Sequence, residues 1–148
     1  MENILRNQSG RLLQLGIGLL IFVSVEGFAI PHVASSRLAL SAHSLGGLQS
    51  ALLLALGLVW PQLALPAFAA RTAFWLLVYS TFAILLAYVL GAFWGAGNET
   101  MPLAAGAAHG SSWQEASIRL VAYSSAPTGL VSFALILWGL RGRAFPAS

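Results

Sequence analysis

The sequence predicts an all-α integral membrane protein, folded as one antiparallel bundle of four transmembrane helices. Of its 148 residues, 58% are hydrophobic and 7% are charged, whereas a soluble domain carries about a quarter charged residues. Four apolar stretches have the length, roughly 20 residues, that a helix needs to cross the hydrocarbon of a bilayer. We expect one domain, residues 1–148, with helices at about 11–30, 41–64, 71–96 and 114–140.

The first helix is expected to begin at Arg11, after a polar segment that carries Arg6. Arginines before an apolar stretch also fit a secretory signal, with residues 33–35 as a conceivable cleavage site. The apolar stretch is long for a signal and contains Glu26. A retained transmembrane helix is therefore favoured, and Pro31 turns the chain toward the second helix.

The second helix opens with residues 41–50, SAHSLGGLQS, which place His43 at or just inside the membrane boundary. Gly46, Gly47 and Ser50 follow three, four and seven residues later, on the same helical face. An imidazole above a face with almost no side chains suits a flat ligand bound by the histidine, such as a haem. It equally suits another helix that packs closely against small residues.

The third helix begins at Arg71 and carries many aromatic side chains. Ala87, Gly91 and Gly95 form a face of small residues near its far end. Such a face lets helices approach closely, either within the bundle or between subunits. Because a single bundle this small also favours assembly, we expect this face to mediate contact between subunits.

A loop of about residues 97–113 precedes the fourth helix and is too polar and glycine-rich to lie against lipid unless it is covered. Within the fourth helix, Pro127 removes a backbone donor and should produce a kink. The hydroxyl groups of Ser124, Ser125 and Thr128 are close enough in sequence to satisfy the freed carbonyl.

The basic residues predict the orientation of the bundle. All seven are arginine, and they form no cluster or stripe of the kind that binds nucleic acid. Five lie on the side of the two termini and two on the opposite side: Arg6, Arg11, Arg71, Arg141 and Arg143 against Arg37 and Arg119. The excess of arginine places both termini in the cytoplasm, and we expect a multi-pass protein of a bacterial inner membrane.

The composition limits the kinds of metal or cofactor site that the chain can form. The chain has no cysteine and no aspartate, and it has three histidines, which argues against disulfides, thiolate metal sites and metal cages. His32 and His109 fall in loops and are interpreted as surface residues. A single deep histidine, His43, would leave the opposite face of a haem iron open to substrate. That arrangement favours Lewis-acid or oxygen chemistry over electron transfer.

Polar side chains gather in the non-cytoplasmic half of the predicted bundle, where ionisable groups usually face partners or a cavity. Simpler interpretations exist: Glu26 could pair with Arg119 for solvation, Glu115 could be a first-turn acid favoured by the helix dipole, and Tyr88 could lie in the interfacial aromatic belt. Their convergence on one layer nevertheless predicts a site, whose candidate residues are Glu26, His43, Gln49, Tyr88, Glu115 and Arg119.

A set of short sequences in a fixed order carries a family resemblance. They are GFAIP at 27–31, SAH at 41–43, GLVWP at 57–61, AFW at 73–75, WGAG at 94–97, MP at 101–102, WQE at 113–115 and LWGLR at 137–141. In this order and spacing, which covers nearly the whole chain, the sequence resembles the hydroxylaminobenzene mutases, small four-helix membrane proteins similar to styrene oxide isomerase.

The resemblance implies a redox-neutral isomerase that rearranges hydroxylaminobenzene to 2-aminophenol. It further implies a homotrimer with ferric haem b near the subunit interfaces, bound by His43. Gln49 falls where the family has a substrate-facing asparagine, Tyr88 matches a tyrosine of the isomerase, and Ile84 stands where relatives carry asparagine. These two departures concern the substrate and keep open an isomerase of aryl epoxides, from styrene oxide to phenylacetaldehyde. The rival class is a non-enzymatic haem-binding membrane sensor or carrier.

The same resemblance assigns the expected roles of the site residues. Ferric iron bound by His43, above Gly46, Gly47 and Ser50, would act on the oxygen of a small aromatic substrate. Gln49 would orient that oxygen, and Tyr88 would stabilise it or relay a proton. Glu115 and Arg119 would anchor either the haem propionates or the outer loop.

Overall fold

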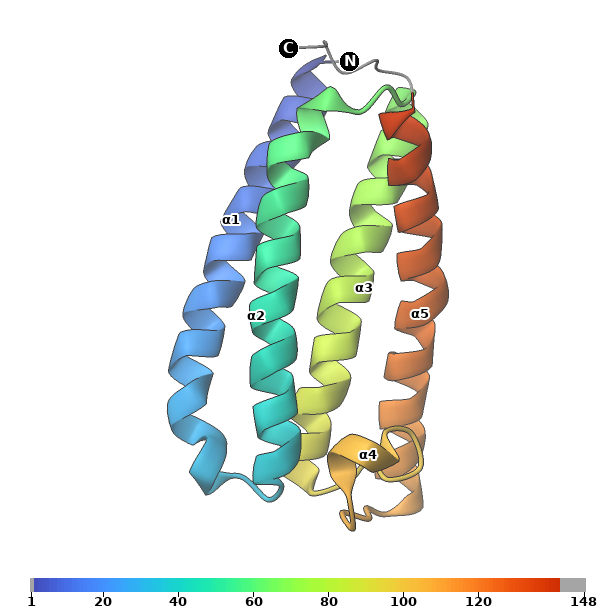
Figure 1. The fold of residues 1–148 in the computed structure, drawn as a ribbon. Helices are drawn as coiled ribbons and strands as arrows, with labels where there is room; N and C mark the ends of the chain where they lie inside the picture. Colours follow the sequence, from blue (N-terminus) through green and yellow to red (C-terminus); the bar gives the residue numbers. More distant parts are fainter. Residues whose placement is uncertain (1, 142–148) are drawn as a thin grey trace.

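The computed structural model describes residues 2–141 and contains four long helices that run antiparallel in chain order (Figure 1). The long helices are α1 (Glu2–Glu26), α2 (Ser36–Val59), α3 (Ala67–Trp94) and α5 (Ser112–Leu140). The connections contain η1 (Gly27–His32), η2 (Trp60–Gln62) and the short helix α4 (Pro102–Ala105). All four long helices are apolar and long enough to cross a membrane. The predicted four-helix, all-α membrane fold is confirmed.

The start of α1 and the end of α5 lie at one end of the bundle, the terminal end, and η1 and α4 lie at the other, the loop end (Figure 1). The number and order of the helices agree with the sequence prediction. The largest difference is the start of the first helix, at Glu2 rather than at residue 11. The second and third helices also begin and end earlier than expected, at Ser36–Val59 and Ala67–Trp94.

The polar start of α1 is helical because its side chains bond inside the terminal end of the bundle. The buried Ser9 hydroxyl donates to the Gly57 carbonyl at 2.7 Å. The Gln8 amide donates to the Ala70 carbonyl at 3.3 Å and accepts from the Trp60 indole N–H at 3.0 Å. These hydrogen bonds offset the cost of burying the polar groups, so the helix continues beyond its apolar stretch.

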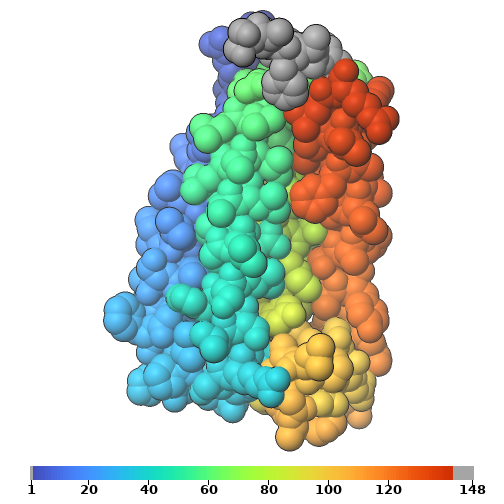
Figure 2. All heavy atoms as spheres, in the orientation of Figure 1, coloured from blue at the N-terminus to red at the C-terminus, as the bar shows by residue number. Residues whose placement is uncertain are grey.

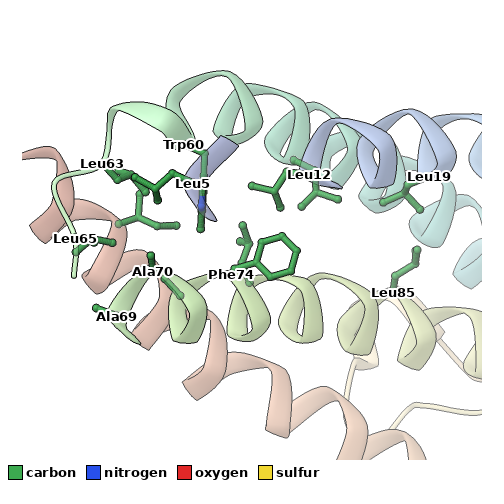
Figure 3. Close-up of a cluster of buried hydrophobic side chains, with 14 of the residues drawn as sticks. Leu5, Leu12, Leu19, Trp60, Leu63, Leu65, Ala69, Ala70, Phe74 and Leu85 are labelled. Atoms are coloured by element: carbon green, nitrogen blue, oxygen red, sulfur yellow. The ribbon is translucent and has the colours of Figure 1, made fainter. Parts of the chain in front are cut away.

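The core at the terminal end is built around Trp60, which is fully buried. Its ring lies 6.2 Å, edge to face, from that of Phe74 on α3, and leucines of α1 and of the α2–α3 connection surround the pair (Figure 3). Aromatic pairs of this geometry contribute about 0.5–1.5 kcal/mol beyond the area they bury. This core joins α1 and α2 to α3.

The bundle is two helix pairs joined side by side. α1 packs mainly on α2, α3 packs mainly on α5, and contacts of α2 with α3 connect the pairs. Figure 2 shows this arrangement on one face of the molecule, where α3 is visible between α2 of the first pair and α5 of the second. Glycines permit the close contact of α1 with α2, since a Cβ at Gly57 would lie 2.9 Å from Leu13.

The small-residue face on α3 lies within the chain. Ala87 is fully buried, and a Cβ at Gly91 would lie 2.9 Å from the Ala96 carbonyl oxygen and 3.2 Å from Leu38 of α2. Gly95 ends α3 in a left-handed conformation, with φ of 63°. Of the two uses that the sequence allowed, the structure shows packing inside the bundle, so the expectation that this face lies between subunits is wrong.

Helix α5 continues as one helix across Pro127. The proline frees the carbonyl of Tyr123, one turn earlier, and the nearby hydroxyl groups bond to other carbonyls, so the expectation that they satisfy the freed carbonyl stays a prediction. The Thr128 hydroxyl lies 2.9 Å from both the Ser124 and the Ser125 carbonyl oxygens, and Ser80 of α3 donates to the Ser125 carbonyl at 2.8 Å. These bonds add hydroxyl donors to the turn around Pro127, and the bond from Ser80 ties α5 to α3.

Candidate functional site

The site begins with an acid and a histidine on neighbouring helices. Glu26 is the last residue of α1, and His43 lies in the first third of α2. Because η1 reverses the chain tightly, the two residues face each other at the loop end, with His43 Nδ1 3.2 Å from Glu26 Oε2. The expected alternative pairing of Glu26 with Arg119 is wrong, since Arg119 bonds to Glu99 instead.

The imidazole is held along one edge. Besides the Glu26 carboxylate at Nδ1, Gly27 lies against the ring, because a Cβ there would be only 3.1 Å from the His43 Cε1 atom. The His43 side chain is 36% exposed. Within residues 2–141 its other nitrogen, Nε2, has no hydrogen-bond partner. The ring is therefore oriented by the chain at Nδ1 while Nε2 stays available to a ligand.

The three small residues that follow His43 differ in their surroundings. The space beside Gly46 is filled by α1, because a Cβ at this position would collide with the Val23 side chain. Ser50 is fully buried, and its hydroxyl donates to the Gly46 carbonyl at 2.8 Å. Gly47 has open space, since a Cβ at this position would meet nothing within 4 Å. The helix-packing interpretation applies to Gly46, and room for a ligand remains beside Gly47.

Gln49 lies near the middle of α2, six residues after His43. At 3.6 residues per turn, the two side chains leave the helix about 120° apart, so one chain does not bring them together. The Gln49 side-chain oxygen is buried and has no hydrogen-bond partner among the described residues. Such an unpaired group costs about 1–3 kcal/mol, which makes Gln49 a candidate for contact with a ligand.

Tyr88 lies near the loop end of α3 and is half-buried. Its ring packs against both apolar clusters of the core, and its hydroxyl makes no hydrogen bond with the rest of the described chain. Ile84, one turn earlier on α3, packs against the apolar cluster at the loop end. The role of Tyr88 in proton transfer stays a prediction.

Glu115, in the first turn of α5, organises the loop that leads to this helix. The residue is 2% exposed, and its carboxylate accepts backbone N–H bonds from Gly97 at 2.7 Å, Gly110 at 3.0 Å and Glu99 at 3.4 Å. Both ends of the loop are therefore fastened to one side chain. Of the two roles that the resemblance offered Glu115, these contacts support anchoring of the outer loop.

Arg119 also contacts that loop, through an ion pair with Glu99 at 3.1 Å in which each side chain is about half exposed. Exposed pairs of this kind contribute about 0–1 kcal/mol. From the opposite side, the Arg37 guanidinium donates to the Leu103 carbonyl at 2.6 Å. The loop is thus fastened over the end of the bundle, and binding of a propionate by Arg119 stays a prediction.

An apolar groove runs between α1 and α3 toward Glu26. It consists of a cavity of about 630 Å³ and a second of about 260 Å³ nearer the loop end, which share Phe22 and Val89 as lining residues. Phe82 lines the first cavity, and Glu26 and Phe93 line the second. The groove has the size and the aromatic lining for a small aromatic molecule, and no sequence pattern indicated it.

The donor set suits a cofactor that brings most of its own ligands. No three His, Cys, Asp or Glu side chains gather to hold a metal ion in residues 2–141. A haem needs only one axial ligand from the protein. An imidazole whose other nitrogen meets a carboxylate is the usual environment of a metal-binding histidine. His43, with Glu26 at Nδ1 and open space at Gly47, fits this requirement.

Comparison with known proteins identifies the family, because residues 8–141 match the family model described as styrene oxide isomerase. The chain belongs to the styrene oxide isomerase family. Two curated relatives come from Ectopseudomonas oleovorans. Hydroxylaminobenzene mutase HabB is 48% identical over 131 residues, which cover 88% of this chain and 80% of the relative. Hydroxylaminobenzene mutase HabA is 32% identical over 125 residues, which cover 84% of this chain and 93% of the relative.

No solved structure matches this member of the styrene oxide isomerase family. The family and the two mutases confirm the resemblance that the sequence suggested, and they show that the chain is an enzyme of the isomerase or mutase type. With its four membrane-length helices, it is a multi-pass membrane protein.

Proposed function

We propose that this enzyme rearranges hydroxylaminobenzene and similar aryl hydroxylamines to 2-aminophenols without net oxidation or reduction. The observation that supports this substrate class best is the 48% identity to a hydroxylaminobenzene mutase across 88% of the chain. The apolar groove, with its aromatic lining, suits the ring of such a substrate.

The proposal includes haem b as cofactor, with His43 as its protein ligand. A ferric haem would supply a Lewis acid that weakens the N–O bond of the substrate. The chain fits this group through the free Nε2 of His43, the open space at Gly47 and the carboxylate at Nδ1. His43 is 36% exposed in one chain, and the proposal includes a homotrimer in which a neighbouring copy would shield the cofactor.

Other side chains would control the substrate rather than bind the cofactor. The buried, unpaired side-chain oxygen of Gln49 would orient the substrate by accepting a hydrogen bond from its O–H or N–H group. The Tyr88 hydroxyl, which has no partner among the described residues, would donate or relay a proton. Aromatic rings can hold a positively charged arene intermediate by face contact, while apolar walls keep water from capturing it.

The assay that tests the function uses purified protein with hydroxylaminobenzene and neither an oxidant nor a reductant. We expect stoichiometric conversion to 2-aminophenol, followed by chromatography. Styrene oxide, the substrate named in the family description, is the comparison, and its faster conversion to phenylacetaldehyde would replace the proposed substrate class with aryl epoxides. Turnover of neither compound by haem-loaded protein would overturn the proposal.

The proposed location is a bacterial inner membrane with both termini in the cytoplasm. Arg6, Arg11, Arg71 and Arg141 lie at the terminal end of the bundle, and Arg143 lies outside the described residues. Arginine-rich ends stay on the cytoplasmic side. A topology reporter fused after residue 148 should therefore report a cytoplasmic location. One inserted in the loop at 97–113 should report a location outside the cytoplasm. The reverse pattern would invert the assigned orientation.

A further inference from the structure

We propose that Glu26 is a positioning residue for His43. Its carboxylate fixes the imidazole tautomer that presents Nε2 to the cofactor, and its negative charge favours the ferric state. This inference rests on the proposed function, in which His43 binds a haem.

Glu26 and Gly27 hold the His43 ring from one side. Glu26 Oε2 lies 3.2 Å from His43 Nδ1, and the Glu26 side chain is 15% exposed. Gly27, the next residue, lies against the adjacent Cε1 atom, where any Cβ would approach to 3.1 Å. Rotation of the ring would break the first contact, so these two consecutive residues together set its orientation.

Among residues 2–141, the Glu26 carboxylate has His43 as its side-chain partner. The two arginines at the same end of the bundle are engaged elsewhere, Arg37 with the Leu103 carbonyl and Arg119 with Glu99. A partly buried carboxylate is costly unless it is paired. Its position is therefore explained by the hydrogen bond to the histidine and not by an arginine of the described chain.

The chemistry follows from the hydrogen bond. A neutral imidazole that donates its Nδ1–H to the carboxylate keeps the lone pair on Nε2, and the bond makes that nitrogen a stronger donor. Ferric haem carries one more positive charge than ferrous haem, so a nearby carboxylate stabilises the ferric form. Glu26 thus sets both the ligand atom and the reduction potential.

The test compares Glu26→Gln, Glu26→Ala and the control Glu99→Gln, a change of an exposed acid at the same end of the bundle. Hemin titration monitored by Soret absorption gives the affinity, and a spectroelectrochemical titration gives the potential. Glu26→Gln keeps an acceptor for Nδ1–H but loses the charge, so its potential should shift positive. Glu26→Ala should also weaken hemin binding by about 10–100-fold. Glu99→Gln should match the wild type.

A readout without cofactor separates this inference from the proposed function. In haem-free protein, ¹⁵N NMR should find the His43 proton on Nδ1 in the wild type and in Glu26→Gln, and a mixture of tautomers in Glu26→Ala. Wild-type protein that takes up no hemin would overturn the haem proposal and, with it, the cofactor role of Glu26. Tight hemin binding with unchanged potential, affinity and tautomer in both variants would overturn the role of Glu26 alone, and a lower melting temperature with an unchanged potential would assign it to structure.

Discussion

Haem retention and mutase activity are both expected to be lost in His43→Ala. The substitution removes the proposed axial ligand, and removal of even a supporting partner of a ligand costs about 10–100-fold, so activity should fall by at least about 100-fold. Alanine suits the helix, and the 36% exposed ring leaves little core to collapse. The variant should therefore insert and purify normally, while its Soret band disappears and its rate with hydroxylaminobenzene falls in proportion to haem content.

The other two histidines provide the control. His32 and His109 are exposed in η1 and in the loop before α5, and alanine at either position should leave the spectrum and the rate unchanged. Lost activity with an intact Soret band would make His43 a proton relay instead of a ligand. Wild-type protein without Soret absorption, prepared from cells well supplied with haem, would rule out His43 as a haem ligand.

The second large effect is expected on stability, in Glu115→Ala. The change leaves the N–H groups of Gly97, Gly110 and Glu99 without their acceptor. Charge-assisted bonds contribute about 1.5–3 kcal/mol each, and loss of a buried hydrogen-bond network belongs among the largest single-residue effects. We expect the free energy of unfolding to fall by about 3–5 kcal/mol, measured by thermal unfolding in detergent, with faster proteolysis within residues 97–111.

Glu99→Ala is the matched control, since it removes a carboxylate from the same loop. Its pair with Arg119 is half exposed, so the expected loss is at most about 1 kcal/mol. Equal losses in the two variants would show that the buried network does not determine the stability of the loop.

The fold could be predicted because a bilayer allows few alternatives. Each apolar stretch must form a helix to satisfy its backbone, and four such stretches with short connections lead to an antiparallel bundle. The predicted start of the first helix was wrong, because the polar residues there lie outside the apolar stretch and the bilayer does not require them to be helical. Gln8 and Ser9 are polar, so hydropathy offers no reason to extend the first helix, yet both are buried by contacts with distant residues.

The sequence predicted which residues belong to the candidate site, but not which of them contact one another. Sequence spacing placed Glu26 and His43 at similar depth, yet depth alone could not choose between His43 and Arg119 as the partner of Glu26. That choice depends on how each helix is rotated about its axis. Rotation also decides that Gly46 faces α1 while Gly47 faces open space, although periodicity placed both on one face.

The pairing of Glu26 with His43 has a consequence for biogenesis. Both residues belong to the first helical hairpin, α1 and α2, and the last of them is residue 43. Membrane helices leave the ribosome in chain order, so this pair can form before α3 and α5 have been synthesised. Tyr88 and the loop fastened by Glu115 follow only with the second hairpin. The nascent chain would thus complete the proposed haem ligand first and the proposed surroundings of the substrate afterwards.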